Sequence, residues 1–256
     1  MGIAGAHART GVTIAVLLLC ASAQAQEMPV NFTGWYGYEG YHPFEAGEPW
    51  GLFGEGYIKR NDHAILEPMQ YFVRLGVNYS LRNGNRLTGG LAYQYNLPYD
   101  EASEPYSWPD YRIWEQFMIR RPGPKGMWVH RFRMEQRWLG RKDDPSESGY
   151  SEYDFENTFR YMLRRTFRFG DTLYAIAYGE VHLRLPPPDS DKLFDQNRVY
   201  LGLGINLDRK KEWRIETGYM LQQVFEPSVE ATGKKRVNHV FRVSLTSDAP
   251  FAGSAR

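Results

Sequence analysis

The chain has 256 residues, of which 31 are basic and 30 acidic, and this near-neutral balance excludes a strongly basic nucleic-acid-binding protein. Its one cysteine, Cys20, lies in an N-terminal segment that we interpret as a signal peptide, which excludes a disulfide framework for the mature chain. Aromatic residues make up 15% of the sequence, yet no apolar run after that segment is long enough for a membrane-spanning helix.

Residues 1–25 have the parts of a secretory signal peptide. Arg9 supplies the positive charge, residues 12–20 the apolar stretch, and residues 21–25 the small side chains of a cleavage site. Cys20 raises the alternative of a lipoprotein, but Leu19 before it is larger than such motifs require. We therefore expect residues 26–256 to form one exported domain, since about 230 residues suit a single large β domain.

Apolar and polar side chains alternate with the period of a β-strand through most of the mature chain. Segments 33–41 and 50–60 are the first candidates, and 69–82 and 86–97 form a clear hairpin around Asn83 and Gly84. Seven further candidates follow: 111–121, 127–139, 153–166, 172–184, 195–207, 212–223 and 236–247. The eleven segments predict an antiparallel up-and-down transmembrane β-barrel of 10 to 12 strands. We expect ten or twelve, because an antiparallel barrel with both termini in the periplasm needs an even number.

Short turns and longer loops alternate along the chain. Short turns are predicted at 83–84, 122–126, 169–171 and 208–211, and longer loops at 61–69, 98–110, 140–152, 186–193 and 225–235. Outer-membrane barrels are built in this order, with the turns on the periplasmic side. Aromatic residues at strand ends are predicted to form interfacial girdles: Tyr71, Tyr79, Tyr95, Trp128, Trp138, Trp213 and Tyr219. A secreted soluble β-sandwich is the alternative, although it has no reason to keep that loop order.

The polar face of the strands is rich in charge. It carries nine arginines and five acids: Arg74, Arg131, Arg133, Arg137, Arg160, Arg164, Arg198, Arg214 and Arg242, with Glu135, Asp154, Glu156, Glu180 and Glu216. Buried charges must be paired or hydrated, so this face predicts an ion-pair network that fills a narrow lumen. The excess of arginine leaves open a second hypothesis, a passage or pocket that favours anions.

Several stretches of the sequence resemble a family of uncharacterised bacterial outer-membrane proteins, the domain of unknown function number twenty-four-ninety. The likeness is carried by residues 194–204 (FDQNRVYLGLG), 112–116, 130–137, 34–36, 50–56 and 216–220. The resemblance extends over nearly all of the mature chain and implies an outer-membrane β-barrel without an established activity. One departure is that this chain continues past Leu245 to Arg256, whereas similar proteins tend to stop at an aromatic residue that ends the last strand.

The string Phe194, Asp195, Gln196, Asn197 and Arg198 lies where a long loop enters a strand. Asp195 and Asn197 are favoured as partners of the loop backbone, and Arg198 as a member of the lumen network. The alternative is a polar ligand site at this position.

No catalytic constellation stands out. The mature histidines are His42, His63, His130, His182 and His239, and none has the context of a serine hydrolase or the spacing of a metal site. His182 beside Glu180 is the one pairing of interest, and it fits a hydrogen-bonded lumen histidine. Glu115, Glu135 and Glu180 have no fixed spacing that supports a carboxylate pair.

The sequence therefore predicts an outer-membrane β-barrel with a structural or passive-transport role, not an enzyme, without cofactor or metal. The expected location is the cell outer membrane after export through the periplasm. Expected partners are outer-membrane lipid and lipopolysaccharide and the barrel-assembly machinery, and no nucleic acid. A lipid-modifying enzyme and a secreted soluble β protein remain as alternatives.

Overall fold

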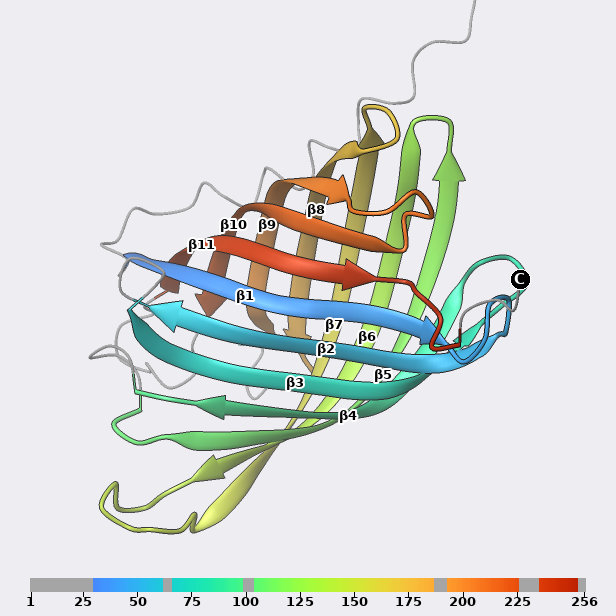
Figure 1. Ribbon diagram of the computed structural model, residues 1–256. Coiled ribbons are helices and arrows are strands. Elements are labelled where there is room, and N and C mark those ends of the chain that lie inside the picture. The colour runs from blue at the N-terminus through green and yellow to red at the C-terminus, as the bar shows by residue number, and fades with distance from the viewer. Residues whose placement is uncertain (1–29, 62–65, 99–103, 187–192, 226–234, 253–256) are drawn as a thin grey trace, which may run out of the picture.

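The alternation in the sequence produces eleven β-strands that close into a barrel (Figure 1). The structure, a computed structural model, describes residues 30–61, 66–98, 104–186, 193–225 and 235–252. The expected signal peptide at 1–25 and His63 lie outside these ranges. The strands are β1 (Val30–Pro43), β2 (Trp50–Asn61), β3 (Glu67–Ser80), β4 (Arg86–Asn96), β5 (Trp108–Gly123), β6 (Gly126–Arg141), β7 (Glu152–Arg168), β8 (Leu173–Arg184), β9 (Phe194–Asn206), β10 (Trp213–Phe225) and β11 (Lys235–Ser247).

The barrel closes through a parallel seam between its first and last strands. All other neighbours are consecutive and antiparallel, whereas β1 runs parallel to β11 from the pair Val30 and Val237 to the pair Gly40 and Ser247. A β-barrel of 10 to 12 strands is thus confirmed, but the expected even number is wrong. The expectation assumed antiparallel pairing throughout, and one parallel pair allows an odd number of strands to close.

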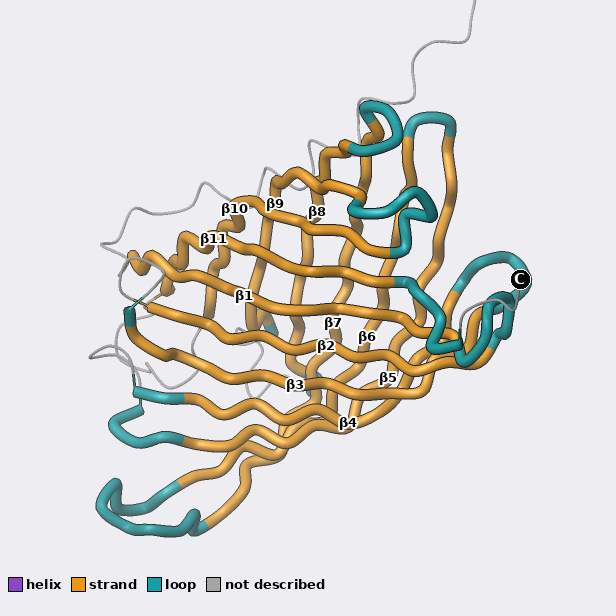
Figure 2. The backbone as a smooth tube through the Cα atoms, in the orientation of Figure 1, coloured by secondary structure: helices purple, strands orange, loops and turns teal. Residues whose placement is uncertain are grey.

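The connections separate into two ends of the barrel (Figure 2). Five of them, at 44–49, 81–85, 124–125, 169–172 and 207–212, lie at one end, which we call the short-turn end. The connections 62–66, 97–107, 142–151, 185–193 and 226–234 join strands at the other end, the long-loop end. The predicted alternation of turns and loops agrees with this division. The connection after β2 is shorter than expected, because β2 runs to Asn61 and β3 begins at Glu67.

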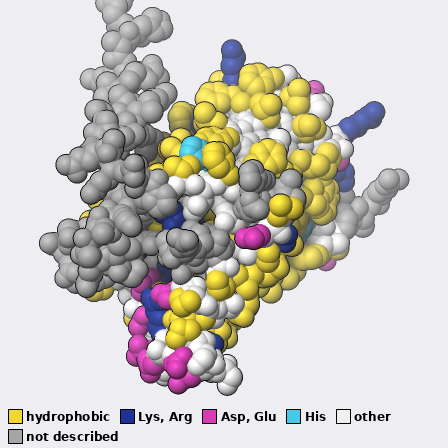
Figure 3. Space-filling view, turned by 90° about the vertical axis from the view of Figure 1, so that its left-hand side faces the viewer, with side chains coloured by type: hydrophobic (Ala, Val, Ile, Leu, Met, Phe, Trp, Pro, Cys, Tyr) yellow, Lys and Arg dark blue, Asp and Glu magenta, His cyan; other side chains and the backbone are white. Residues whose placement is uncertain are grey.

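Each strand presents an apolar face outward. Leu75, Leu91 and Leu201 are more than 60% exposed on the wall, although they stand in the middle of their strands. Seen from the long-loop end, hydrophobic side chains dominate the outside of the wall (Figure 3). Glu115 interrupts this surface on β5, where it accepts a hydrogen bond from Gln136 at 3.2 Å. Among the residues that the structure describes, no helix is long and apolar enough to cross a membrane.

The inside of the barrel holds apolar side chains as well as charges. One buried cluster includes Trp35, Tyr57, Tyr200 and Met220, and the other is centred on Phe53 and Trp114. Gly76 and Gly90 pair across β3 and β4 next to Trp114, and a Cβ at Gly76 would lie 2.8 Å from the indole Cζ2. The indole thus occupies space that only glycine leaves free. The predicted Arg-rich polar interior is therefore incomplete, since aromatic rings share the lumen.

The residues after the last strand fold back along the short-turn end. The Phe251 amide donates to the Pro43 carbonyl at 2.9 Å, and the Phe251 ring lies 5.1 Å from the His42 ring. His42 also contacts the Ala249 carbonyl at 2.7 Å through Nδ1. The segment beyond Leu245 thus fastens the end of β11 to the end of β1.

Candidate functional site: charged layers inside the lumen

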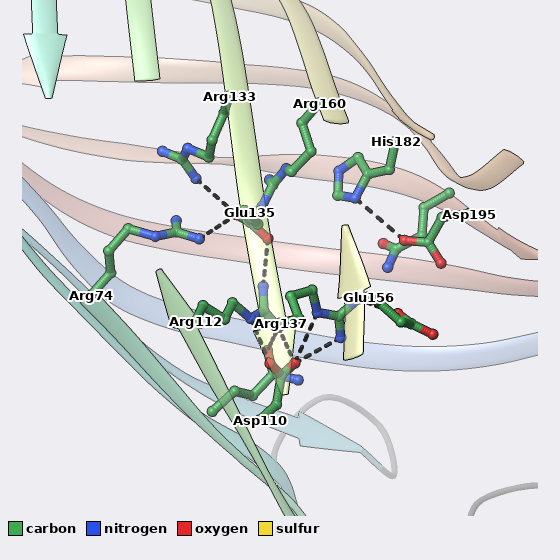
Figure 4. A network of polar contacts seen from close by, with 12 residues as sticks. Arg74, Asp110, Arg112, Arg133, Glu135, Arg137, Glu156, Arg160, His182 and Asp195 are labelled. Carbon is green, nitrogen blue, oxygen red and sulfur yellow. Dashed lines mark hydrogen bonds and ion pairs between the residues drawn. The ribbon is translucent and has the colours of Figure 1, made fainter. Parts of the chain in front are cut away.

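Glu135 is the centre of a layer of ion pairs at mid-lumen (Figure 4). Its carboxylate lies 2.5 Å from Arg74 on β3, 2.8 Å from Arg112 on β5 and 2.8 Å from Arg160 on β7. Arg133 approaches the same carboxylate at 3.8 Å and donates to Gln116 at 2.7 Å. Arginines from β3, β5 and β7 thus converge on one acid of β6. Glu135, Arg74 and Arg133 are each only 1% exposed.

Glu180 on β8 is the second acid that several cations share. It accepts from Arg131 at 2.7 Å and from Arg160 at 2.9 Å, and Arg198 on β9 lies 3.4 Å away. The His182 Nε2 atom lies 3.4 Å from the same carboxylate. Arg160 therefore links the Glu180 group to the Glu135 layer, and the two sets of charges form one connected network.

A third group lies nearer the long-loop end. Asp110 on β5 accepts from Arg112 at 2.5 Å and from Arg137 at 2.7 Å, and Arg137 also lies 3.4 Å from Glu156 (Figure 4). Asp154 accepts from Arg141 at 2.7 Å at the rim. Of the predicted residues Arg131, Arg133, Glu135, Arg137, Arg160, Glu180 and Arg198, the structure brings all into this connected set.

The remaining predicted residues, Arg214 and Glu216, lie toward the short-turn end, where each of them binds a different partner. Glu216 accepts from Arg164 at 2.5 Å and from the Tyr174 hydroxyl at 2.9 Å. Arg214 instead donates to Asp248 at 2.7 Å, and Arg86 binds the other oxygen of Asp248 at 3.0 Å. The sequence pattern did not point to Asp248, because it lies just beyond the last strand.

The ion pairs of Asp248 with Arg86 and Arg214 make the stability of the fold depend on pH in the acid range. Burial raises the pKa of the Asp248 carboxyl, but Arg86 and Arg214 outweigh it and lower the pKa to about 2. Because the folded pKa lies below the unfolded value of 3.8, the stabilisation is complete above that value and is lost as pH falls toward 2. We expect this carboxylate to contribute about 1 to 2 kcal/mol at neutral pH.

The measurement is thermal unfolding of the wild type and of Asp248→Asn between pH 7 and pH 2, followed by circular dichroism. The wild type should be the more stable protein at pH 7, and the difference should shrink between pH 4 and pH 2. Melting curves whose separation stays constant over this range would contradict the assignment.

The loop-to-strand motif contributes side chains to the lumen. Asp195 accepts from Arg184 on β8 at 2.5 Å and lies 3.8 Å from His182 Nδ1, so its described partners are side chains of the lumen. Gln196 accepts from Arg198 at 2.8 Å, and the Phe194 ring packs 6.3 Å from Phe225. Asn197 pairs in register with Gln223 and Val181 within the sheet.

Two cavities lie in the described lumen, one toward each end of the barrel, and we call them the short-turn chamber and the long-loop chamber. The short-turn chamber has a volume of about 250 Å³, and the long-loop chamber of about 320 Å³. Both touch Trp35, Glu55, Tyr57, Arg160 and Arg198, which lie at the boundary between them. Arg74 and Glu135 line only the long-loop chamber, and Arg131 and Glu180 only the short-turn chamber.

Some members of the network had no clear signal in the sequence. Glu55 on β2 binds Arg74 at 2.5 Å, but its strand alternates glycine with large residues, so the inward face is hard to assign. Asp110 and Arg112 share an inward face with Trp114 and Met118, which hides the polar period. A period-two pattern over 108–120 that accepts tryptophan and methionine on the inward face would have identified both residues.

The other sequence candidates do not assemble into a site. His130 contacts the Tyr161 hydroxyl at 2.9 Å, His239 contacts the Tyr219 hydroxyl at 2.5 Å, and His42 contacts the Tyr38 hydroxyl, all away from the charged layers. Glu115 is on the outer wall, so its carboxylate points away from the acids in the lumen. Over the described ranges, no group of three or more His, Cys, Asp or Glu is arranged to hold a metal ion.

Comparison with known proteins places the chain in a family but gives it no activity. The search of curated proteins and the search of solved structures each returned no match. The model of a family described as a protein of unknown function, DUF2490, matches residues 32–232, and the chain therefore belongs to this family.

Proposed function

We propose that the protein is an outer-membrane β-barrel whose lumen is closed by ion pairs, with a structural role in the membrane instead of that of an open pore. The observation that carries this proposal is the apolar outer wall. Large hydrophobic side chains are exposed on every side of the barrel, on strands of 11 to 17 residues. A wall of this kind is costly in water, whereas strands of about 9–11 residues suffice to cross a bilayer.

The charged layers support closure of the lumen. Arg74, Arg133 and Glu135 are almost completely buried, and Arg74 and Glu135 line the long-loop chamber but not the short-turn chamber. Ions crossing the barrel would have to break pairs of 2.5 to 2.8 Å that bind Glu135. The anion-selective passage suggested by the excess of arginine is therefore the less favoured form of the function.

The remaining parts of the proposal follow from the wall and the N-terminal sequence. Export through the periplasm with a signal peptide at 1–25 would deliver the chain to the outer membrane, with lipid and lipopolysaccharide around the barrel and the barrel-assembly machinery as the partner for insertion. We propose no enzymatic activity, because the lumen carboxylates are held by arginines and His182 lies between two acids.

The test combines fractionation with conductance. We expect the protein in the outer-membrane fraction, with a band that shifts on boiling during electrophoresis because folded barrels resist detergent. Purified protein in a planar bilayer should give no stepwise conductance. A porin with a water-filled channel in the same bilayer serves as the conducting control.

The membrane location and the closed lumen are tested by different outcomes. A soluble periplasmic band without a heat shift would overturn the membrane location and favour a secreted β protein. A heat-modifiable membrane band together with stable conductance steps would keep the location and overturn the closed lumen.

A further inference from the structure

The long-loop chamber has the size and polarity of a small-molecule site. Its volume of about 320 Å³ lies at the lower end of the range for ligand pockets. Its described lining includes Lys59, Gln70, Arg198, Gln222 and Asn238, which come from β2, β3, β9, β10 and β11. Side chains from both sides of the parallel seam therefore face one cavity.

Acids that line this chamber already have partners. All five are paired with arginine: Glu55 and Glu135 with Arg74, Glu104 with Arg141, Glu156 with Arg137, and Asp195 with Arg184. Their negative charge is therefore directed to these guanidinium groups. The chamber has no described acid left over to neutralise a further cation.

Lys59 is that further cation. Its side chain is buried, with 9% of the residue exposed, and its ammonium group donates to the neutral Gln70 amide oxygen at 2.7 Å. The Nζ atom lies 4.2 Å from the centroid of the Trp35 ring. Among the described residues, no carboxylate forms an ion pair with Lys59. A buried ammonium group without a counter-ion is costly, and a bound anion would remove that cost.

Arg198 lies beside the same ring. Its guanidinium carbon is 5.1 Å from the Trp35 centroid, and its closest acid is Glu180 at 3.4 Å, which also serves Arg131 and Arg160. The Nε atom of Arg198 is buried and has no hydrogen-bond partner in the described structure. Two cations thus approach one indole ring at the edge of the chamber.

Amide groups line the adjacent wall. Gln222 donates to Gln196 at 2.7 Å and accepts from Asn238 at 3.1 Å, while Asn238 Oδ1 is buried without a donor in the described residues. Gln222 and Asn238 both line the chamber, so their amide groups can form hydrogen bonds with hydroxyl groups of a ligand. The wall therefore adds hydrogen-bonding groups to the positive charge of Lys59 and Arg198.

We propose that the long-loop chamber binds a small hydroxylated carboxylate of the sugar-acid class. The carboxylate lies against Lys59 and Arg198, and hydroxyl groups form hydrogen bonds with the amide groups of Gln222 and Asn238. This inference goes beyond the closed barrel proposed above and does not depend on the membrane location.

The test is isothermal titration of the purified full-length mature protein with D-glucuronate, D-glucose and inorganic phosphate. Glucuronate should bind at least tenfold more tightly than glucose, which has the same ring without the carboxylate. It should also bind more tightly than phosphate, which has the charge without the sugar hydroxyl groups. Equal affinity for glucose would overturn the role of charge, and equal affinity for phosphate would overturn the role of the hydroxyl group.

Lys59→Met tests the site itself, because methionine keeps most of the side-chain volume and removes the charge. We expect at least a tenfold loss of glucuronate affinity together with an unchanged or raised melting temperature, since the substitution removes a buried unpaired charge. Lys211→Met is the matched control, because Lys211 lies at the short-turn end and pairs with Asp171 at 2.7 Å. Glucuronate affinity that is unchanged in Lys59→Met, or lost equally in Lys211→Met, would overturn the proposal.

Discussion

Replacing Glu135 with glutamine will destabilise the barrel by about 3 to 5 kcal/mol, the range for breaking a buried ion pair from one side. The change keeps the shape of the side chain but removes the charge that Arg74, Arg112 and Arg160 share. The three guanidinium groups, of which Arg74 is only 1% exposed, then repel one another inside the lumen. Denaturant unfolding of the refolded protein in detergent, followed by tryptophan fluorescence, measures the loss.

Glu156→Gln is the matched control. Glu156 is partly exposed near the long-loop end and lies 3.4 Å from Arg137, which keeps Asp110 as a partner. Its loss should cost less than about 1 kcal/mol. Equal effects of the two glutamine substitutions would show that the central layer has no special weight.

Trp114→Ala will cost about 3 to 5 kcal/mol, the range for deleting a large buried aromatic side chain. The indole is 1% exposed and packs edge-on against Phe53 at 5.3 Å between ring centroids. Its ring also lies 5.1 Å from the Arg74 guanidinium and 5.3 Å from that of Arg133. Removing it would leave a cavity beside Gly76 and would free both arginines from a cation–π contact.

Trp50→Ala separates this effect from the general loss of a tryptophan. Trp50 is on the outer wall, is 51% exposed and contacts Tyr79 at 4.7 Å between ring centroids. No internal cavity forms there, so the loss of unfolding free energy should be about 1 kcal/mol or less. Comparable losses for the two variants in the same detergent would refute the role assigned to Trp114.

The positions of the strands could be predicted from the sequence because each strand carries its own alternation. The segments 69–82 and 86–97 correspond closely to β3 and β4, where one face is apolar over the whole length. Even the weaker run at 172–184 corresponds to β8. The order of turns and loops was equally readable, since it depends on local composition.

Closure and pairing across the lumen could not be predicted in the same way. Whether β1 pairs with β11 depends on two segments about 200 residues apart, and no local pattern records the direction of that pair. The contact between Arg74 and Glu135 joins residues 61 positions apart across the lumen. Which acid meets which arginine depends on the stagger of the strands around the barrel. The sequence therefore indicated a charged interior but not which charged residues form pairs with one another.

The parallel seam also restricts how the chain can be rearranged. In an even-stranded barrel the first and last strands end at the same rim, so a short turn can join them and new termini can be opened elsewhere. Here β1 begins at the long-loop end and β11 finishes at the short-turn end, separated by the length of a 13-residue strand, about 40 Å. A circular permutant would need a linker of about 12 or more extended residues running along the whole wall. Circular permutation is consequently much harder for this barrel than for barrels that close through an antiparallel pair of strands.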